Sequence, residues 1–167
     1  MRSTPIMEEL GKFVVDFQAV EAALVDLIIR LTDSDCEYIA ALTAELEFNS
    51  KARALDIIFG RFSQLHGLTN KSPHPEFHKL MVRVQKLATR RNEIVHSFYN
   101  FFVNVDGEVG IRRTPTKLKP SEGIRQQQQE DILAEQLQVE VTEIKSLLSD
   151  LEFYRLEVID LLNPIEE

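Results

Sequence analysis

Apolar side chains recur at helical spacing along most of this chain, and this pattern limits the fold more than any other feature. The clearest stretch runs from about Met7 to Leu31, where large apolar residues follow one another at intervals of three or four. A helix of this kind buries one stripe against neighbours of the same kind. The pattern therefore predicts an all-α fold, a bundle of about five helices.

Cap and turn residues set the expected ends of these helices. The segment Thr32 to Asp35 ends the first helix and offers caps for the second. Asn49 and Ser50 are expected to cap the third helix, and Pro75 suits the first turn of the fourth. The expected elements are helices at about 7–31, 36–46, 49–65, 75–97 and 131–162, with loops at 67–74 and 114–130.

The helical pattern changes after His96. Residues 98–105 are rich in aromatic and β-branched side chains, and Asp106-Gly107 separates them from a second such run at 108–112. An Asp-Gly pair between runs of this kind is a strong hairpin signal. We therefore expect a β-hairpin at about 98–113, inserted before the long C-terminal helix of a single domain spanning 1–167.

Charge is unevenly distributed. The chain carries a net charge of −8, which argues against indiscriminate nucleic-acid binding. Residues 79–125, however, contain ten basic and four acidic side chains. This segment could hold a polyanion locally. The alternative is a solvated helix face followed by a charged loop.

Cysteine content and hydropathy suggest a compartment. Cys36 is the only cysteine, so no internal disulfide can form and a reducing cytosol is the simplest expectation. The first ten residues contain no apolar signal-like region, and no apolar run approaches the roughly 20 residues that span a bilayer. We expect a cytoplasmic protein without a membrane partner.

One short segment, Arg90 to Ser97, combines groups suited to chemistry on a phosphodiester. Arg91 offers a planar fork of donors, and His96 can move a proton near neutral pH. On an ideal helix the two lie about 140° apart and roughly 7.5 Å along the axis, whereas Asn92 and His96 share a face. Arg91 and His96 could converge at the helix end, or a two-fold partner could supply a second copy of each. Alternatively, Arg91 pairs with an acid and His96 interacts with the helix dipole.

The string Arg91-Asn92-x-x-x-His96 resembles the signature of the HEPN superfamily, in which a His follows an Arg after four to six residues and Asn often follows the Arg directly. The motif of that superfamily lies at the end of a helix in an all-α bundle, as expected here. Many HEPN proteins are metal-independent endoribonucleases that act as homodimers. The resemblance covers most of the chain as architecture and these few residues as motif.

The resemblance implies a role for each motif residue. His96 would be the general acid/base for attack of a ribose 2′-hydroxyl on the adjacent phosphate, giving a 2′,3′-cyclic phosphate and a 5′-hydroxyl. Arg91 would stabilise charge on the phosphoryl oxygens, and Asn92 would orient His96 or the phosphate. The basic residues expected to hold RNA are Arg83, Lys86, Arg90, Arg112 and Arg113.

The wider expectation is a homodimeric toxin or defence effector acting on RNA, with an antitoxin or regulatory protein as a further partner and no cofactor. Two alternatives stay open: a non-catalytic HEPN-like module that binds RNA or nucleotide, and a structural helical dimerisation protein. One HEPN branch, paired with a nucleotidyltransferase antitoxin, has a Tyr two residues after the His. Here that position is Phe98, and Tyr99 comes one residue late.

Two charged residues interrupt apolar stripes. Glu21 lies on the stripe of the first helix and Lys51 on that of the third. Lone buried charges are costly, so a Glu21–Lys51 pair is one expectation. The other places Glu21 against Arg91 or His96 as support for the site. The sequence neighbours His66, His74 and His78 lack a cysteine or carboxylate set, and no metal site is expected.

Overall fold

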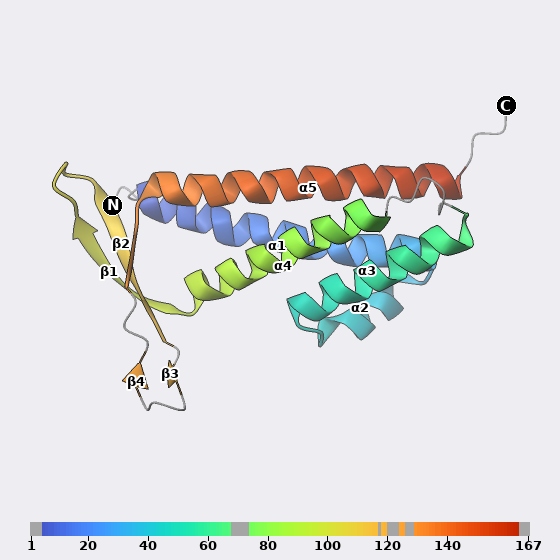
Figure 1. The fold of residues 1–167 in the computed structure, drawn as a ribbon, viewed down its shortest axis with the longest axis horizontal. Coiled ribbons are helices and arrows are strands. Elements are labelled where there is room, and N and C mark those ends of the chain that lie inside the picture. Colours follow the sequence, from blue (N-terminus) through green and yellow to red (C-terminus); the bar gives the residue numbers. More distant parts are fainter. Residues whose placement is uncertain (1–4, 68–73, 117, 120–123, 126–128, 164–167) are drawn as a thin grey trace. The chain divides into compact units, whose positions relative to one another are not determined.

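The computed structural model describes residues 5–67, 74–116, 118–119, 124–125 and 129–163, and it confirms the predicted all-α class with a β-hairpin before the last helix (Figure 1). The helices are α1 (Pro5–Thr32), α2 (Cys36–Ala44), α3 (Phe48–Leu65), α4 (His74–Val95) and α5 (Ala134–Leu162). The strands are β1 (Ser97–Val103), β2 (Val109–Pro115), β3 (Leu118–Lys119), β4 (Ile124–Arg125) and β5 (Glu130–Ile132). No helix in these described ranges is both long and apolar enough to cross a bilayer.

The sheet has three antiparallel strands in the order β1-β2-β5, while β3 and β4 pair separately. β1 and β2 are aligned from Val103 opposite Val109 to Ser97 opposite Pro115. β5 continues the sheet on the far side of β2, with Ile111 opposite Ile132. Both isoleucines are buried, so one face of the sheet is anchored in apolar surroundings.

The predicted hairpin turn has a three-residue loop. The Asn104 amide donates to the Glu108 carbonyl at 2.9 Å, and the Gly107 amide donates to the Asn104 carbonyl at 3.1 Å. Gly107 has a φ of +83°, a conformation that glycine adopts without a steric penalty. This geometry is typical of three-residue hairpin loops and explains the Asp-Gly signal.

Chain contacts divide the molecule into two compact units, and the three long helices contribute to both. The first unit contains the described parts of Met1–Phe17 and Thr89–Ile144, including the sheet. The second contains the described parts of Gln18–Ala88 and Lys145–Glu167. In the described part of the first unit, the buried apolar side chains are Ile6, Phe13, Phe17, Ile94, Ile111, Ile132, Leu137, Val141 and Ile144. Those of the second include Leu24, Leu27, Leu55, Phe59, Phe77, Met81, Leu147 and Leu151.

Aromatic packing joins three helices within the second unit. The ring of Phe59 on α3 stacks on Phe77 of α4, with centroids 3.9 Å apart. Tyr154 of α5 meets both rings edge-on, at 5.4 Å and 4.9 Å. Offset-stacked and edge-on geometries are the favoured aromatic contacts, so these rings fix how the three helix segments pack.

Several predicted boundaries were wrong. Asn49 and Ser50 lie inside α3, which begins after Glu47 and has no side-chain cap at that end. α4 begins one residue before Pro75, so His74 is helical. At the start of α2 the prediction holds, because the Asp35 carboxylate accepts from the amides of the second and third helical residues.

The predicted loop at 114–130 is only partly correct. β2 extends to Pro115, and Glu130 to Ile132 form a third strand of the main sheet, so α5 starts at Ala134. A three-residue strand is too short to show a period in the sequence, and its partners lie about twenty residues earlier. Positions 117, 120–123 and 126–128 of this predicted loop lie outside the described residues.

Candidate functional site

The Arg–His motif lies where α4 ends and β1 begins. α4 stops at Val95, earlier than expected, and His96 is the single residue between helix and strand. The His96 backbone amide donates to the Asn92 carbonyl at 3.0 Å, and its carbonyl accepts from Thr116 Oγ1 at 2.7 Å. The backbone of His96 is therefore held on both sides while its side chain is exposed to solvent.

Side chains from the strands explain why the helix ends there. The last carbonyls of a helix have no intrahelical donor and need other partners. Ser97 Oγ donates to the Glu93 carbonyl at 2.6 Å, and Arg113 Nη1 donates to the same oxygen at 3.0 Å. Tyr99 donates its hydroxyl to the carbonyl of Ile94. Burial raises the pKa of this half-buried Tyr99, so the hydroxyl stays a donor.

Arg91 is held without a carboxylate. Its Nη1 donates to Asn92 Oδ1 at 3.0 Å, and its guanidinium carbon lies 5.5 Å from the ring centroid of Phe17, a buried residue of α1. Such a cation–π contact positions a cation without neutralising it. No ion pair forms between Arg91 and any described acid. Asn92 therefore contacts Arg91 through its side chain and His96 through its backbone.

Arg90, the neighbouring residue, has the opposite environment. It forms a bidentate pair with Glu130, at 2.9 Å and 2.7 Å, and its Nε donates to Glu140 at 2.8 Å. Hydrogen bonds from Arg90 are the main reason that the pKa of Glu130 lies below its ordinary value. Arg90 thus connects α4 to β5 and α5, a structural role that leaves its charge compensated.

Carboxylates of β5 also compensate the two arginines of β2. Arg113 Nε lies 2.9 Å from Glu130 Oε2. Arg112 binds Asp131 through two bonds of 2.6 Å and 2.8 Å, and its guanidinium lies over the ring of Phe102. Three of the five residues expected to bind RNA therefore pair with acids inside their own unit. Glu130 and Asp131 were not among the residues expected from the sequence. Their signal is the Glu-Asp dipeptide, which lies opposite the Arg-Arg dipeptide of β2.

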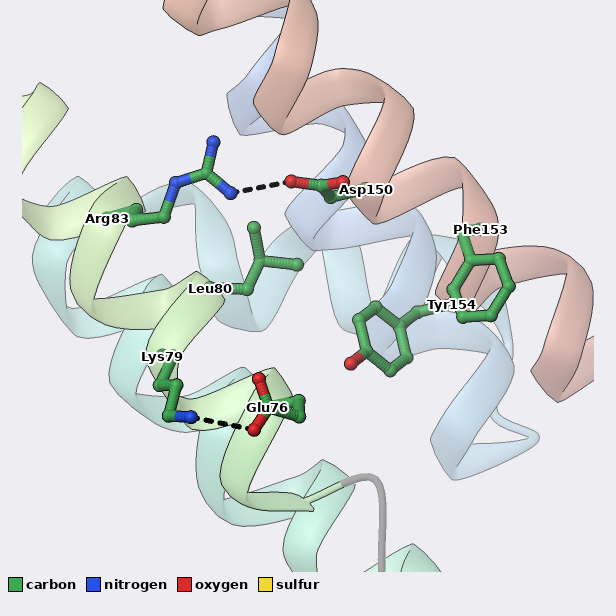
Figure 2. A pocket seen from close by; sticks show the side chains of 7 residues that line it. All are labelled: Glu76, Lys79, Leu80, Arg83, Asp150, Phe153 and Tyr154. Carbon is green, nitrogen blue, oxygen red and sulfur yellow. Dashed lines mark hydrogen bonds and ion pairs between the residues drawn. The ribbon is translucent and has the colours of Figure 1, made fainter.

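The other two expected RNA-binding residues, Arg83 and Lys86, lie in the second unit. Arg83 donates to Asp150 at 2.6 Å and to Ser146 at 3.1 Å. Figure 2 shows Arg83 reaching Asp150 across a pocket between α4 and α5, with Tyr154 on the same helix as Asp150. The residues lining this pocket are Glu76, Lys79, Leu80, Arg83, Asp150, Phe153 and Tyr154. Lys86 is exposed and forms no ion pair with the acids that the structure describes.

The two charges on apolar stripes pair with each other. Lys51 Nζ lies 2.5 Å from Glu21 Oε1, and the Lys51 side chain is only 9% exposed. This contact joins α1 to α3 inside the second unit and confirms the expected Glu21–Lys51 pair. Glu21 therefore compensates Lys51, which is a structural role.

We expect the substitution Glu21→Gln to lower the free energy of unfolding by about 2 kcal/mol, because it weakens a hydrogen bond to a buried charge. Urea denaturation measures this effect. Adding Lys51→Met should recover part of the loss, since the uncompensated ammonium is then removed. RNA cleavage that fell in folded Glu21→Gln would contradict this purely structural role.

Two of the three neighbouring histidines share one carboxylate. His78 Nδ1 lies 2.6 Å from Asp56 Oδ2, and His74 Nε2 lies 3.7 Å from Asp56 Oδ1. His66 instead packs its ring on Phe62. In the described part of the chain, no group of three or more His, Cys, Asp or Glu side chains is placed to hold a metal ion.

The network around Glu130 makes stability depend on pH. Because its pKa is lowered by folding from an ordinary value of 4.5, its contribution is fully present above that value and is lost as the pH falls further. We expect the free energy of unfolding to decrease as the pH falls from about 5 to about 3. Urea titrations at several pH values should give a shallower dependence for Glu130→Gln, and equal slopes would contradict the assignment.

The end of α4 thus combines the Arg91 guanidinium, which has no carboxylate partner among the described residues, with the exposed imidazole of His96. The neighbouring arginines are paired with carboxylates. Comparisons with protein-family models, with curated proteins and with solved structures gave no match to this chain.

Proposed function

We propose that the protein is a HEPN-like, metal-independent endoribonuclease whose reaction centre contains Arg91, Asn92 and His96. The observation that carries this proposal is the difference between two adjacent arginines. Arg90 is compensated by Glu130 and Glu140, whereas Arg91 keeps its charge uncompensated by any described acid. A cation held by an amide and an aromatic face remains available for a phosphate.

The roles follow from these contacts. His96 accepts the proton of a ribose 2′-hydroxyl, and the resulting oxygen attacks the adjacent phosphorus. The bond from phosphorus to the 5′-oxygen breaks, which yields a 2′,3′-cyclic phosphate and, once that oxygen is protonated, a 5′-hydroxyl. Arg91 stabilises the charge that develops on the phosphoryl oxygens. Asn92 holds the Arg91 guanidinium through the 3.0 Å hydrogen bond.

Because most of these arginines are paired with carboxylates, few cations are available to contact RNA. Arg83, Arg90, Arg112 and Arg113 each form an ion pair with a carboxylate. A contact that uses few free cations gives a weak salt dependence of binding. We therefore expect the protein to contact RNA close to the scissile phosphate and not over an extended basic surface.

The test is incubation of the protein with mixed single-stranded and structured RNA in EDTA, followed by analysis of the ends. Fragments with 2′,3′-cyclic phosphate and 5′-hydroxyl ends support the proposal, provided that they disappear in folded His96→Ala and Arg91→Ala variants. No cleavage by the wild type, or equal cleavage by all three proteins, refutes catalysis. RNA affinity then separates a binding module from a structural dimerisation protein.

A further inference from the structure

β1 forms an unprotected edge of the main sheet. One edge of β1 pairs with β2, and no described strand pairs with its other edge (Figure 1). The seven residues Ser97–Val103 contain no charged side chain and no proline. Natural edge strands usually carry lysine, proline or a bulge, because unpaired backbone groups otherwise bind another strand. Such an edge is expected to have a partner.

The hairpin geometry fixes which backbone groups face outward. Asn104 and Glu108 form a hydrogen-bonded pair at the turn. In an antiparallel ladder such pairs alternate with non-bonded pairs, so Phe98, Asn100 and Phe102 direct their amides and carbonyls to β2. Ser97, Tyr99, Phe101 and Val103 consequently present theirs to the open edge.

Exposed apolar side chains accompany this edge. Phe98 is 56% exposed, and Phe101 and Val103 are each 65% exposed. Phe98 lies on one face of the strand, whereas Phe101 and Val103 lie on the other, because side chains alternate. An added strand would cover apolar surface on both faces, which is the main driving force for association.

We propose that β1 pairs antiparallel with β1 of a second copy, about a two-fold axis at Asn100. In this register the outward backbone groups of Tyr99 meet those of the partner's Phe101, which gives hydrogen-bonded pairs. Asn100 lies opposite its own copy in a non-bonded pair. Phe98 lies opposite the partner's Phe102, so aromatic side chains meet across the interface.

The side-chain order of β1 favours a second copy over an unrelated strand, because in this register aromatic residues lie opposite aromatic residues and Asn100 lies opposite itself. Two chains of net charge −8 repel each other over most of their surfaces, and association needs a surface without like charges. β1 provides one, and the arginines of the adjacent β2 are compensated by Asp131 and Glu130. A two-fold interface uses the same surface on both copies, which a neutral strand with a central Asn satisfies. This inference does not depend on ribonuclease activity.

Single-cysteine variants in a Cys36→Ser background test the register. Asn100→Cys should form a reducible dimer under mild oxidation, since directly opposite residues of a non-bonded pair have the Cβ separation that a disulfide requires. Phe98→Cys and Phe102→Cys should each fail to cross-link alone and should cross-link when mixed. Val105→Cys, at a fully exposed turn position, is the control and should react at least about tenfold more slowly than Asn100→Cys.

Sedimentation of proteins without added cysteines provides the second measurement. The Cys36→Ser protein should show a monomer–dimer equilibrium, and Asn100→Lys should shift it to monomer by placing like charges opposite each other. A wild type that stays monomeric at high concentration, a dimer that persists in Asn100→Lys, or equal cross-linking at Val105→Cys would overturn the inference. These readouts involve no RNA, so failure here is distinguishable from failure of the proposed function.

Discussion

Replacing His96 by alanine is expected to lower the rate of RNA cleavage in EDTA by about 100-fold or more, since one general acid/base contributes about 10²–10⁴-fold. The imidazole is exposed, so the fold should be retained. Circular dichroism and urea denaturation should match the wild type. His66→Ala is the matched control, because His66 is also an exposed histidine just beyond a helix end.

Arg91→Ala should lower cleavage by about 10²–10³-fold, the usual effect of removing one group that stabilises transition-state charge. Arg91→Lys should recover little, because a lysine cannot replace a planar fork of donors. Lys86→Ala is the control for charge, since it removes an exposed cation from the same helix. Activity that fell equally in Lys86→Ala and Arg91→Ala would indicate general electrostatic attraction and contradict a specific role for Arg91.

The largest effect on stability is expected for Arg90→Ala, at about 3 kcal/mol, because removing one member of a partly buried ion network leaves the others uncompensated. Glu130 loses a bidentate partner and Glu140 loses a 2.8 Å hydrogen bond. Arg91→Ala should cost at most about 1 kcal/mol, since it loses one hydrogen bond and one cation–π contact. Urea denaturation of both variants at pH 7 measures the difference.

Under the proposed function, the two adjacent arginines have different roles, Arg90 in stability and Arg91 in catalysis. If Arg90→Ala kept the stability of the wild type but lost cleavage, Arg90 would belong to the reaction centre. The distinction between a structural Arg90 and a catalytic Arg91 would then be wrong. Comparison at a temperature where both variants are folded avoids confusing unfolding with loss of chemistry. Arg90→Met gives a second variant, because it keeps the aliphatic contacts of the side chain and removes the guanidinium with its charge and its hydrogen bonds to Glu130 and Glu140.

The local parts of this fold could be predicted from the sequence. Apolar periodicity placed the helices, and Asp106-Gly107 placed the hairpin turn. A cap between Thr32 and Asp35 could be predicted, because capping needs only neighbours along the chain, and Asp35 is the residue that provides it. β5 could not be predicted, since three residues carry no period and their pairing with β2 is set by distant contacts.

The same division applies to the candidate site. A lone charge on an apolar stripe requires a partner, so the Glu21–Lys51 pair could be predicted from two helices. The ion pairs of Arg90 and Arg113 with Glu130 could not be predicted from the sequence, because they depend on the position of the three-residue strand β5. Basic residues counted along the sequence therefore overestimated the charge available to a polyanion.

The passage from α4 to β1 has a mechanical consequence. Only His96 separates helix from strand, and Ser97 and Tyr99 of β1 bind carbonyls of the last helical turn. The backbone that carries the His96 imidazole is therefore a rigid connection between α4 and β1, and it does not act as a hinge. Because of these hydrogen bonds, a displacement of β1, for example by a bound strand, must also move the end of α4. Movement of the hairpin would then change the positions of Arg91 and His96.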